Sequence, residues 1–164
     1  MIVRPATPAD APDMVSLLNQ IIATGGTTAH QTPFDEAKML HHYIVPANPL
    51  SCQVAQVDGT VLGFQWLGWP DNEDMPDGWA IIASFVATKA AGKGIGQHLF
   101  DATLSAAKTA GVATIDATIR ADNVPGLRYY GGLGFIDYDR LVDVPLADGT
   151  IVDRVCKRFD ISAA

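Results

Sequence analysis

Three glycines at alternate positions, Gly92, Gly94 and Gly96, are the residues whose type and spacing most clearly indicate chemistry. They lie in the run AGKGIG that begins at Ala91, between an apolar strand-like segment and a helix-like one. Glycine lets the backbone approach a ligand closely, and the first N–H groups of a helix are free to bind an anion. The run therefore predicts a phosphate-binding loop made of backbone amides.

The spacing of this loop argues against the two common nucleotide motifs. A Walker loop requires Ser or Thr directly after Gly-Lys, whereas Lys93 is followed by Gly94. The dinucleotide fingerprint G-x-G-x-x-G needs a third glycine where the chain has Gln97 or Leu99. A nucleotide-binding protein is therefore disfavoured, and the loop fits a pyrophosphate held by amides and a helix dipole.

The elements that must hold this loop are a strand before it and a helix after it. Residues 79–86 (WAIIASFV) are rich in β-branched and aromatic side chains and follow a turn-like PDG, which indicates a buried strand. Residues 97–110 place apolar side chains at helical spacing, and Gly111 stands where a C-terminal cap belongs. Residues 112–119 (VATIDATI) indicate a second strand, so the segment predicts a strand–loop–helix–strand unit with parallel strands.

Residues 85–135 resemble the acyl-CoA-binding core of the GNAT N-acetyltransferase superfamily, whose loop is usually Gln/Arg-x-x-Gly-x-Gly/Ala before a helix. Gly94 and Gly96 match its glycine positions, whereas Ala91 stands where the family usually has Arg or Gln. A second family pattern consists of Asn, a small residue, Tyr and Gly-Phe after the next strand. Its positions are filled here by Asn123, Gly126, Tyr130, Gly134 and Phe135.

The resemblance implies a single GNAT domain over residues 1–164. Its fold class is α/β (α+β), with a mixed central β-sheet that is splayed at the acyl-CoA site and has helices on both faces. Acetyl-CoA is the implied cosubstrate, and no metal is implied. The residues expected to bind acetyl-CoA are Phe85 and Val86 through the backbone, Gly92, Lys93, Gly94, Ile95, Gly96 and Gln97 around the pyrophosphate, Asn123 near the thioester, and Arg128 through its charge.

The resemblance also implies transfer of the acetyl group to a primary amine by direct attack on the thioester. Tyr130 matches the position that commonly protonates the departing thiolate, so it is the expected general acid. The alternatives are an aromatic that only packs in the core beside Phe135, or the adjacent Tyr129 if the motif is shifted by one residue.

The sequence leaves the general base open. Many relatives carry an acidic residue on the strand before the loop, but residues 80–84 (AIIAS) contain no carboxylate. His30, with a suitable unperturbed pKa, is expected near the acceptor as a base or a contact, unless it is simply an exposed loop histidine. Deprotonation through ordered water is equally consistent with the sequence. The other candidates are Glu36, Glu73, Asp74 and Asp116.

The acceptor is indicated only weakly. Residues 21–33 (IIATGGTTAHQTP) loosely resemble the corresponding region of phosphinothricin-acetyltransferase-like members, which implies a small amino-acid-like amine. Trp66, Trp69 and Trp79 are candidates for a pocket wall, although aromatics on strands more often pack in the core. Two other functions remain open: a catalytically silent acyl-CoA-binding or sensor module, and an acetyltransferase acting on protein lysines or N-termini.

Composition excludes further classes. A formal net charge of −7 without a basic stripe argues against nucleic-acid binding. No apolar run approaches the roughly 20 residues of a membrane helix, and the first residues carry no signal-peptide core. Cys52 and Cys156 show neither a CxxC nor a metal-ligand spacing and are expected to be reduced core residues. The expected protein is cytoplasmic, with a homodimer as its candidate assembly.

The remaining segments predict a frame around this core. A capping box at Thr7–Asp10 begins a helix that reaches about Ala23. The other expected elements are a strand at 2–5, a helix at 35–44, a hairpin of 54–57 and 61–68 turning at Asp58-Gly59, and a hairpin of 135–144 and 151–159.

Overall fold

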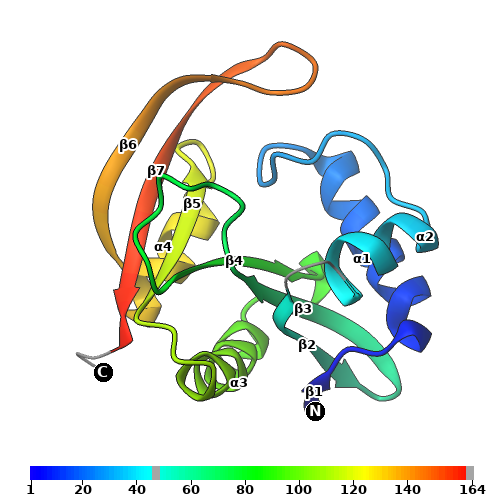
Figure 1. The fold of residues 1–164 in the computed structure, drawn as a ribbon. Coiled ribbons are helices and arrows are strands. Elements are labelled where there is room, and N and C mark those ends of the chain that lie inside the picture. The colour runs from blue at the N-terminus through cyan, green and yellow to red at the C-terminus, as the bar shows by residue number, and fades with distance from the viewer. Residues whose placement is uncertain (46–48, 162–164) are drawn as a thin grey trace.

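The computed structural model describes residues 1–45 and 49–161, which form one mixed sheet packed against helices (Figure 1). Within these residues the sheet has seven strands in the order β1-β2-β3-β4-β5-β7-β6. The strands are β1 (Ile2–Pro5), β2 (Pro49–Val57), β3 (Thr60–Gly68), β4 (Trp79–Val86), β5 (Thr114–Arg120), β6 (Ile136–Pro145) and β7 (Ile151–Asp160). The helices are α1 (Ala11–Thr24), α2 (Glu36–Met39), α3 (Ile95–Thr109) and α4 (Val124–Leu133).

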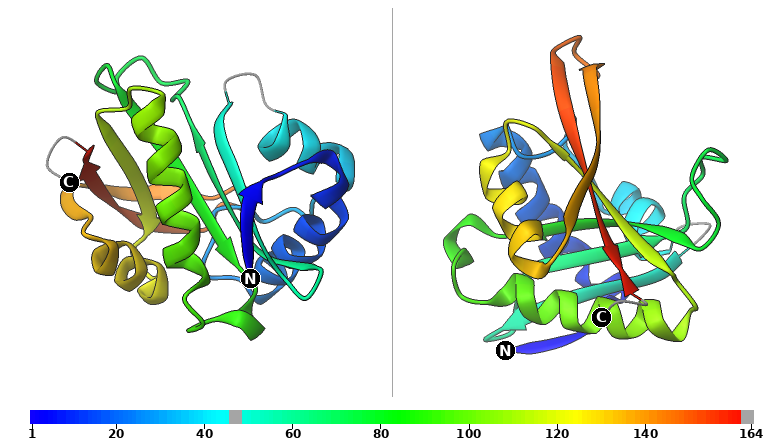
Figure 2. Two further views of the ribbon diagram at one scale, coloured as in Figure 1. Left: turned by 90° about the horizontal axis from the view of Figure 1, so that it is seen from below. Right: turned by 90° about the vertical axis from the view of Figure 1, so that its left-hand side faces the viewer.

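Helices lie on both faces of the sheet, as expected from the resemblance. Figure 2 shows α3 across one face and α1 on the opposite side. Met14 and Leu18 of α1 are fully buried in one core cluster with Phe64 of β3, and Phe100 of α3 is buried in a second cluster with Ile115 of β5. The first cluster also contains Ile95 and Leu99 of α3, so side chains from both faces of the sheet contribute to it.

The strand β4 pairs with β5 over a short length only, and this is the feature that positions the site. Their parallel register covers Trp79–Ile81 against Thr114–Asp116, although β4 continues to Val86 and β5 to Arg120. Beyond Ile81 the two strands separate. The splayed sheet that the family resemblance implied is confirmed.

The β6–β7 hairpin projects from the C-terminal side of the sheet (Figure 2, right). Its two strands pair from Ile136 against Arg158 to Pro145 against Ile151, and β7 pairs with β5 along the whole length of β5. The hairpin thus brings residues near position 154 beside the end of β5.

Several predicted elements are confirmed with small shifts. The turn at Asp58-Gly59 has positive φ at both residues, 49° and 81°, as a tight hairpin of this kind requires. In the capping box, the Thr7 N–H donates to the Asp10 carboxylate at 2.8 Å. The predicted helix 35–44 was wrong in part, because regular α-helix ends at Met39 and a wider π-type turn follows over Leu40–Ile44.

Candidate active site

A pocket of about 190 Å³ opens where β4 and β5 separate. The residues around it come from the two diverging strands, from the loop after α1, from the start of α4 and from β7. They are Thr27, Thr28, Ala29, His30, Tyr43, Ile82, Ala83, Ser84, Phe85, Thr118, Ile119, Arg120, Asn123, Tyr130 and Arg154.

The pocket passes between the strands rather than lying on one face. Successive strand residues point to opposite faces, yet neighbours such as Ser84 and Phe85 both line it. Ser84 faces α4, where it meets Tyr130, whereas Phe85 packs beside His30 with ring centroids 6.3 Å apart. Two ligands entering from opposite faces can therefore meet between β4 and β5.

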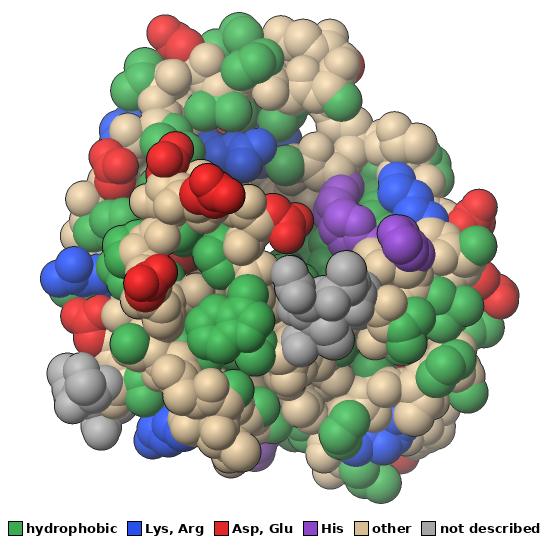
Figure 3. All heavy atoms as spheres, in the orientation of Figure 1, with side chains coloured by type: hydrophobic (Ala, Val, Ile, Leu, Met, Phe, Trp, Pro, Cys, Tyr) green, Lys and Arg blue, Asp and Glu red, His purple; other side chains and the backbone are tan. Residues whose placement is uncertain are grey.

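The surface is hollowed on the side of the His30 loop. Figure 3 shows a depression between the hairpin side and the α1–α2 side, with histidines (purple) at one rim and Lys or Arg side chains (blue) near the other. The residues that line the pocket include a histidine, His30, and two arginines, Arg120 and Arg154.

The glycine loop ends at the N-terminus of α3 with its amides free. Gly92 and Gly94 have φ of 78° and 77°, a conformation that favours glycine, and a Cβ on Gly92 would meet open space. The first backbone hydrogen bond here runs from His98 N to Gly94 O at 3.2 Å, so the amides of Ile95, Gly96 and Gln97 have no helical partner. This arrangement can bind a phosphate group.

A chain of hydrogen bonds joins this loop to Tyr130. The Tyr129 hydroxyl donates to the Gly96 carbonyl at 2.8 Å, and Gln65 Nε2 donates to Tyr129 Oη at 3.0 Å and to Ser84 Oγ at 2.8 Å. Ser84 Oγ lies 2.7 Å from Tyr130 Oη. Ser84 Oγ accepts from Gln65, and either hydroxyl of the Ser84–Tyr130 pair can donate to the other.

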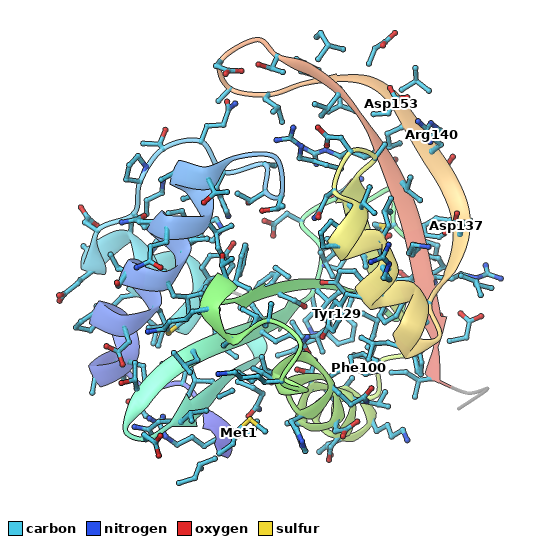
Figure 4. The ribbon with its side chains drawn as sticks, turned by 180° about the vertical axis from the view of Figure 1, so that it is seen from behind. Met1, Phe100, Tyr129, Asp137, Arg140 and Asp153 are labelled. Atoms are coloured by element: carbon cyan, nitrogen blue, oxygen red, sulfur yellow. The ribbon has the colours of Figure 1, made fainter. Side chains whose placement is uncertain are left out.

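The two tyrosines therefore have different surroundings. Tyr130 lines the pocket, while Tyr129 Oη is engaged by Gly96 and Gln65, and Figure 4 shows Tyr129 between α4 and α3. The ring centroids of Tyr130 and Phe135 are 5.1 Å apart, so Tyr130 packs in the core and lines the pocket at the same time. Burial raises the pKa of Tyr130 well above its ordinary value and that of Tyr129 to about 12, so both are protonated at neutral pH.

Asn123 and Arg120 hold the loop after α1 against the end of β5. Asn123 Oδ1 accepts from Gly126 N at 3.0 Å and caps α4, while its Nδ2 donates to Thr27 O at 3.1 Å. A Cβ on Gly126 would lie 2.4 Å from Asn123 Nδ2, which explains the small residue at this position. Arg120 donates to Thr28 O at 3.3 Å. These bonds bring the loop that carries His30 to the pocket.

His30 lies in an aromatic cluster on the pocket wall, not in an exposed position on the loop. Its Nε2 is 2.6 Å from Tyr43 Oη, and its ring contacts Phe34 and His42 edge-on at centroid distances of 4.9 and 5.4 Å. Burial, with smaller effects from the charges of His42 and Lys38, lowers the pKa of His30 to about 4. The imidazole is therefore neutral at pH 7.

This neutral state predicts a pH dependence of stability. In the unfolded chain His30 binds a proton below pH about 6.5, whereas in the folded protein it does so only near pH 4. The contribution of the neutral imidazole to the free energy of unfolding is therefore fully present above pH 6.5. It is lost as the pH falls from 6.5 to 4. We expect the difference in unfolding free energy between wild type and His30→Gln to fall as pH drops from 7 to 4.5, measured by urea denaturation. A difference that is constant with pH contradicts the buried neutral imidazole.

The other predicted residues are placed as follows. Lys93 and Arg128 are exposed beside the loop and on α4. Phe85 lines the pocket. The Ala87 N–H donates to Leu62 O of β3, so by strand alternation the backbone groups of Phe85 face β3 and those of Val86 face the gap between β4 and β5. Among the described residues that line the pocket, none is a candidate carboxylate, and none is a tryptophan.

The candidate carboxylates have other surroundings. Glu36, Glu73 and Asp74 are exposed. Asp116 is 2% exposed and accepts hydrogen bonds from Tyr138 and Thr118, and burial raises its pKa despite these bonds. It lies at the point where β4 and β5 separate, outside the pocket lining.

Several residues of the site were not among those predicted from the sequence, including Tyr43 and Arg120 of the pocket lining. Gln65 and Ser84 complete the chain between the loop and Tyr130, and Arg154 lines the pocket from β7. Polar residues inside the apolar strands 61–68 and 79–86 were the available signal for Gln65 and Ser84. Within residues 1–45 and 49–161, no group of three or more His, Cys, Asp or Glu side chains is arranged to hold a metal ion. No helix of the described chain is long and apolar enough to cross a membrane.

Comparison with known proteins places this geometry in context. The sequence profile of the acetyltransferase (GNAT) family matches residues 16–135. No curated protein sequence matches the chain significantly.

Solved structures share the fold over almost the whole chain. A ribosomal-protein-alanine N-acetyltransferase from Brucella melitensis has a TM-score of 0.84 at 22% identity, over 98% of this chain and 99% of that chain. A phosphinothricin acetyltransferase from Sinorhizobium meliloti, in complex with acetyl-CoA, has a TM-score of 0.81 at 20% identity, over 97% and 87%. YncA from Salmonella typhimurium, with its cofactor acetyl-CoA, has a TM-score of 0.80 at 20% identity, over 98% and 93%.

Proposed function

The chain belongs to the GNAT acetyltransferase family, and on that basis we propose that it moves the acetyl group of acetyl-CoA to a primary amine of a small molecule. The observation that carries the proposal is the 2.7 Å contact between Tyr130 Oη and Ser84 Oγ in the pocket between β4 and β5. A buried phenol that keeps its proton at neutral pH is a suitable acid for a departing thiolate.

The residues around the glycine loop fit acetyl-CoA. The free amides of Ile95, Gly96 and Gln97, with the open backbone at Gly92 and Gly94, suit its pyrophosphate. Lys93 and Arg128 are exposed cations that can approach the phosphates. The backbone of Val86 faces the gap between β4 and β5, and Asn123 lines the same pocket as Tyr130, so both suit the pantetheine arm. Relatives with acetyl-CoA bound support this assignment.

Acetyl-CoA supplies the activated acetyl group. The acceptor nitrogen forms a bond to the thioester carbon, the carbon–sulfur bond breaks, and the electron pair of that bond goes to sulfur. Tyr130 gives its proton to the sulfur, and Ser84 donates its hydroxyl proton in a hydrogen bond to the resulting phenolate. The nitrogen loses one proton to water, and the phenolate of Tyr130 regains one from water. The products are an N-acetyl amine and the free thiol, and the phenol is restored.

We assign His30 to contact the acceptor and not to act as the main base. A pKa of about 4 makes the imidazole a weak base at pH 7, and Nε2 is already bonded to Tyr43. The neutral ring can still accept from or donate to an amine through its other nitrogen. Its place beside Phe85 puts it on the face opposite α4.

A small acceptor suits this pocket better than a polypeptide. The loop after α1 is joined to the tip of the β6–β7 hairpin by the bond from Asp148 N to Gln31 Oε1, at 2.8 Å. This link limits the open groove that a peptide would need.

The location and assembly remain part of the proposal. We propose a cytoplasmic enzyme that forms a homodimer through the hairpin. β6 is an edge strand with exposed apolar side chains, including Ile136 at 54% and Val142 at 63%, and such an edge can pair with a second copy. Light scattering that gives a monomer at micromolar concentration contradicts the dimer.

The test of the proposed function is an acceptor screen with acetyl-CoA across amino acids, polyamines and peptides, followed by thiol release. We expect turnover with one or more small amines and stabilisation by CoA, but not by ATP, in thermal denaturation. Binding of acetyl-CoA without turnover of any amine favours a sensor module, and turnover of peptides alone favours a protein acetyltransferase.

A further inference from the structure

Two arginines lie opposite each other where β5 and β7 border the pocket. Arg120 of β5 is the direct register partner of Arg154 of β7, so their side chains leave the sheet on the same face. Both line the pocket. Two like charges placed directly across a strand pair are unfavourable unless each has a counter-charge.

Only one member of this pair is neutralised in the described structure. Arg120 binds Asp122 with two bonds, Nε to Oδ1 at 3.0 Å and NH2 to Oδ2 at 2.8 Å, and its NH1 donates to Thr28 O. Arg154 takes part in none of the ion pairs formed by residues 1–45 and 49–161. Its Nε is buried and has no hydrogen-bond partner among those residues.

Nearby carboxylates are engaged elsewhere. The adjacent residue in β7, Asp153, pairs with Arg140 at 2.8 Å, and Figure 4 shows these two side chains together on the hairpin. The pKa of Arg120 is raised by its hydrogen bond to Asp122 and, more weakly, by the charge of Asp148, so both of these carboxylates act on Arg120. Asp148 also accepts from Thr150 N at 2.9 Å. The chain has a formal net charge of −7, so an arginine on a pocket wall that forms no ion pair with the described residues is suited to bind an anionic group of a ligand.

We propose that the acceptor amine carries a carboxylate and that Arg154 binds it, so that the substrate class is a small amino acid with a free carboxyl group. The inference rests on the proposed function. Arginine presents donors in a planar fork that matches a carboxylate, including the buried Nε. Ser84 and Tyr130 lie on the β4 side of β5 and Arg154 on the β7 side, so one ligand can place its amine near the thioester and its carboxylate at Arg154.

The rest of the wall suits the remainder of such a ligand. Phe85 is a buried aromatic that lines the pocket beside His30, on the face where Arg120 reaches Thr28 O. Ile82 and Ile119 line the pocket from the other face, where they pack in one core cluster with Tyr130. The aromatic wall on the arginine side favours an apolar side chain over a charged one. Arg154 is therefore a specificity-determining residue, and removing it should affect carboxylated acceptors selectively.

The experiment uses matched acceptors that differ only in the carboxyl group. All standard amino acids are first screened with acetyl-CoA by thiol release. Each amino acid that is turned over is then compared with its amide and its decarboxylated amine, for example leucine, leucinamide and 3-methylbutylamine, at equal concentrations of neutral amine. We expect kcat/KM for the carboxylated member to exceed the others by at least about tenfold.

Variants locate the effect. Arg154→Gln should lower kcat/KM for the amino acid by about 100-fold, leave the amide and the amine within about twofold, and leave the KM of acetyl-CoA unchanged. Arg154→Lys should restore part of the loss, because it keeps the charge but not the fork. Arg158→Gln is the matched control, since Arg158 lies on the same strand, pairs with Asp160 and does not line the described pocket.

The outcomes separate the inference from the proposed function. Turnover of neutral amines with no preference for the carboxylate, or an equal loss on all three acceptors in Arg154→Gln, overturns the inference and leaves the acetyltransferase intact. Failure to turn over any amino acid also overturns it. If no amine of any kind is turned over, the proposed function fails as well.

Discussion

Replacing Tyr130 by phenylalanine is expected to lower kcat by about 10²- to 10⁴-fold, the usual contribution of a positioned acid. The hydroxyl is lost while the ring keeps its contact with Phe135, so the fold and the pocket should persist. The affinity for acetyl-CoA should change little, because the loop at Gly92–Gln97 is untouched. The measurement is steady-state thiol release with the best acceptor, together with calorimetric titration of acetyl-CoA.

The control for this prediction is Tyr129→Phe. Tyr129 Oη bonds to the Gly96 carbonyl and to Gln65, so its loss should act on the loop and raise the KM of acetyl-CoA more than it lowers kcat. If Tyr129→Phe reduces kcat as strongly as expected for Tyr130→Phe, and Tyr130→Phe does not, the acid has been assigned to the wrong tyrosine.

The pH profile gives a further check on the same residue. Burial raises the pKa of Tyr130, so the phenol keeps its proton through the neutral range and beyond its ordinary value of about 10. We therefore expect no loss of kcat from deprotonation of this acid between pH 7 and about 10. A descending limb near pH 8 that disappears in Tyr130→Phe contradicts this environment.

Replacing Gly94 by valine is expected to weaken acetyl-CoA binding by at least about 100-fold. Gly94 has φ of 77°, a region that β-branched residues rarely adopt, and it precedes the first residue of α3. The valine must either strain this turn or move the amides that follow it. Either change displaces the backbone N–H groups that we propose to bind the pyrophosphate.

The matched control is Gly111→Val at the other end of α3. Gly111 has φ of 78° and, like Gly92, would direct a Cβ into open space. The two substitutions share their backbone strain, and urea denaturation of both variants measures that shared cost. Calorimetric affinity for acetyl-CoA should fall in Gly94→Val and not in Gly111→Val. Equal affinities in both variants would show that the loop does not bind the pyrophosphate.

Much of the fold was predictable because its signals are local. The turn at Asp58-Gly59 and the apolar run of β4 depend on short segments of sequence. The helix α4 was not predicted from its sequence, VPGLRYYGGL, because glycine and proline have low helix propensity. It forms because Asn123 caps it and because Tyr130 and Leu133 pack against the sheet core. Tertiary contacts there outweigh the local preference.

The site residues that lie in short sequence motifs could be predicted, whereas those brought together by long-range contacts could not. The loop and Tyr130 lie in two short motifs, so their positions followed from spacing. Gln65 meets Tyr129 across 64 positions of sequence, and Arg154 meets Arg120 only through the register of β5 and β7. The role of His30 also depended on burial by Phe34, Tyr43 and Phe85, which alters its pKa.

The central claim is that acetyl-CoA binds between the separated strands with its thioester beside Tyr130. A crystal structure of the protein with acetyl-CoA tests this most directly. We expect the pyrophosphate on the amides at the start of α3 and the thioester sulfur within about 3.5 Å of Tyr130 Oη, the reach of a hydrogen bond to sulfur. A cofactor bound elsewhere, or a sulfur that points away from Tyr130 with no donor beside it, would rule out Tyr130 as the acid in this site.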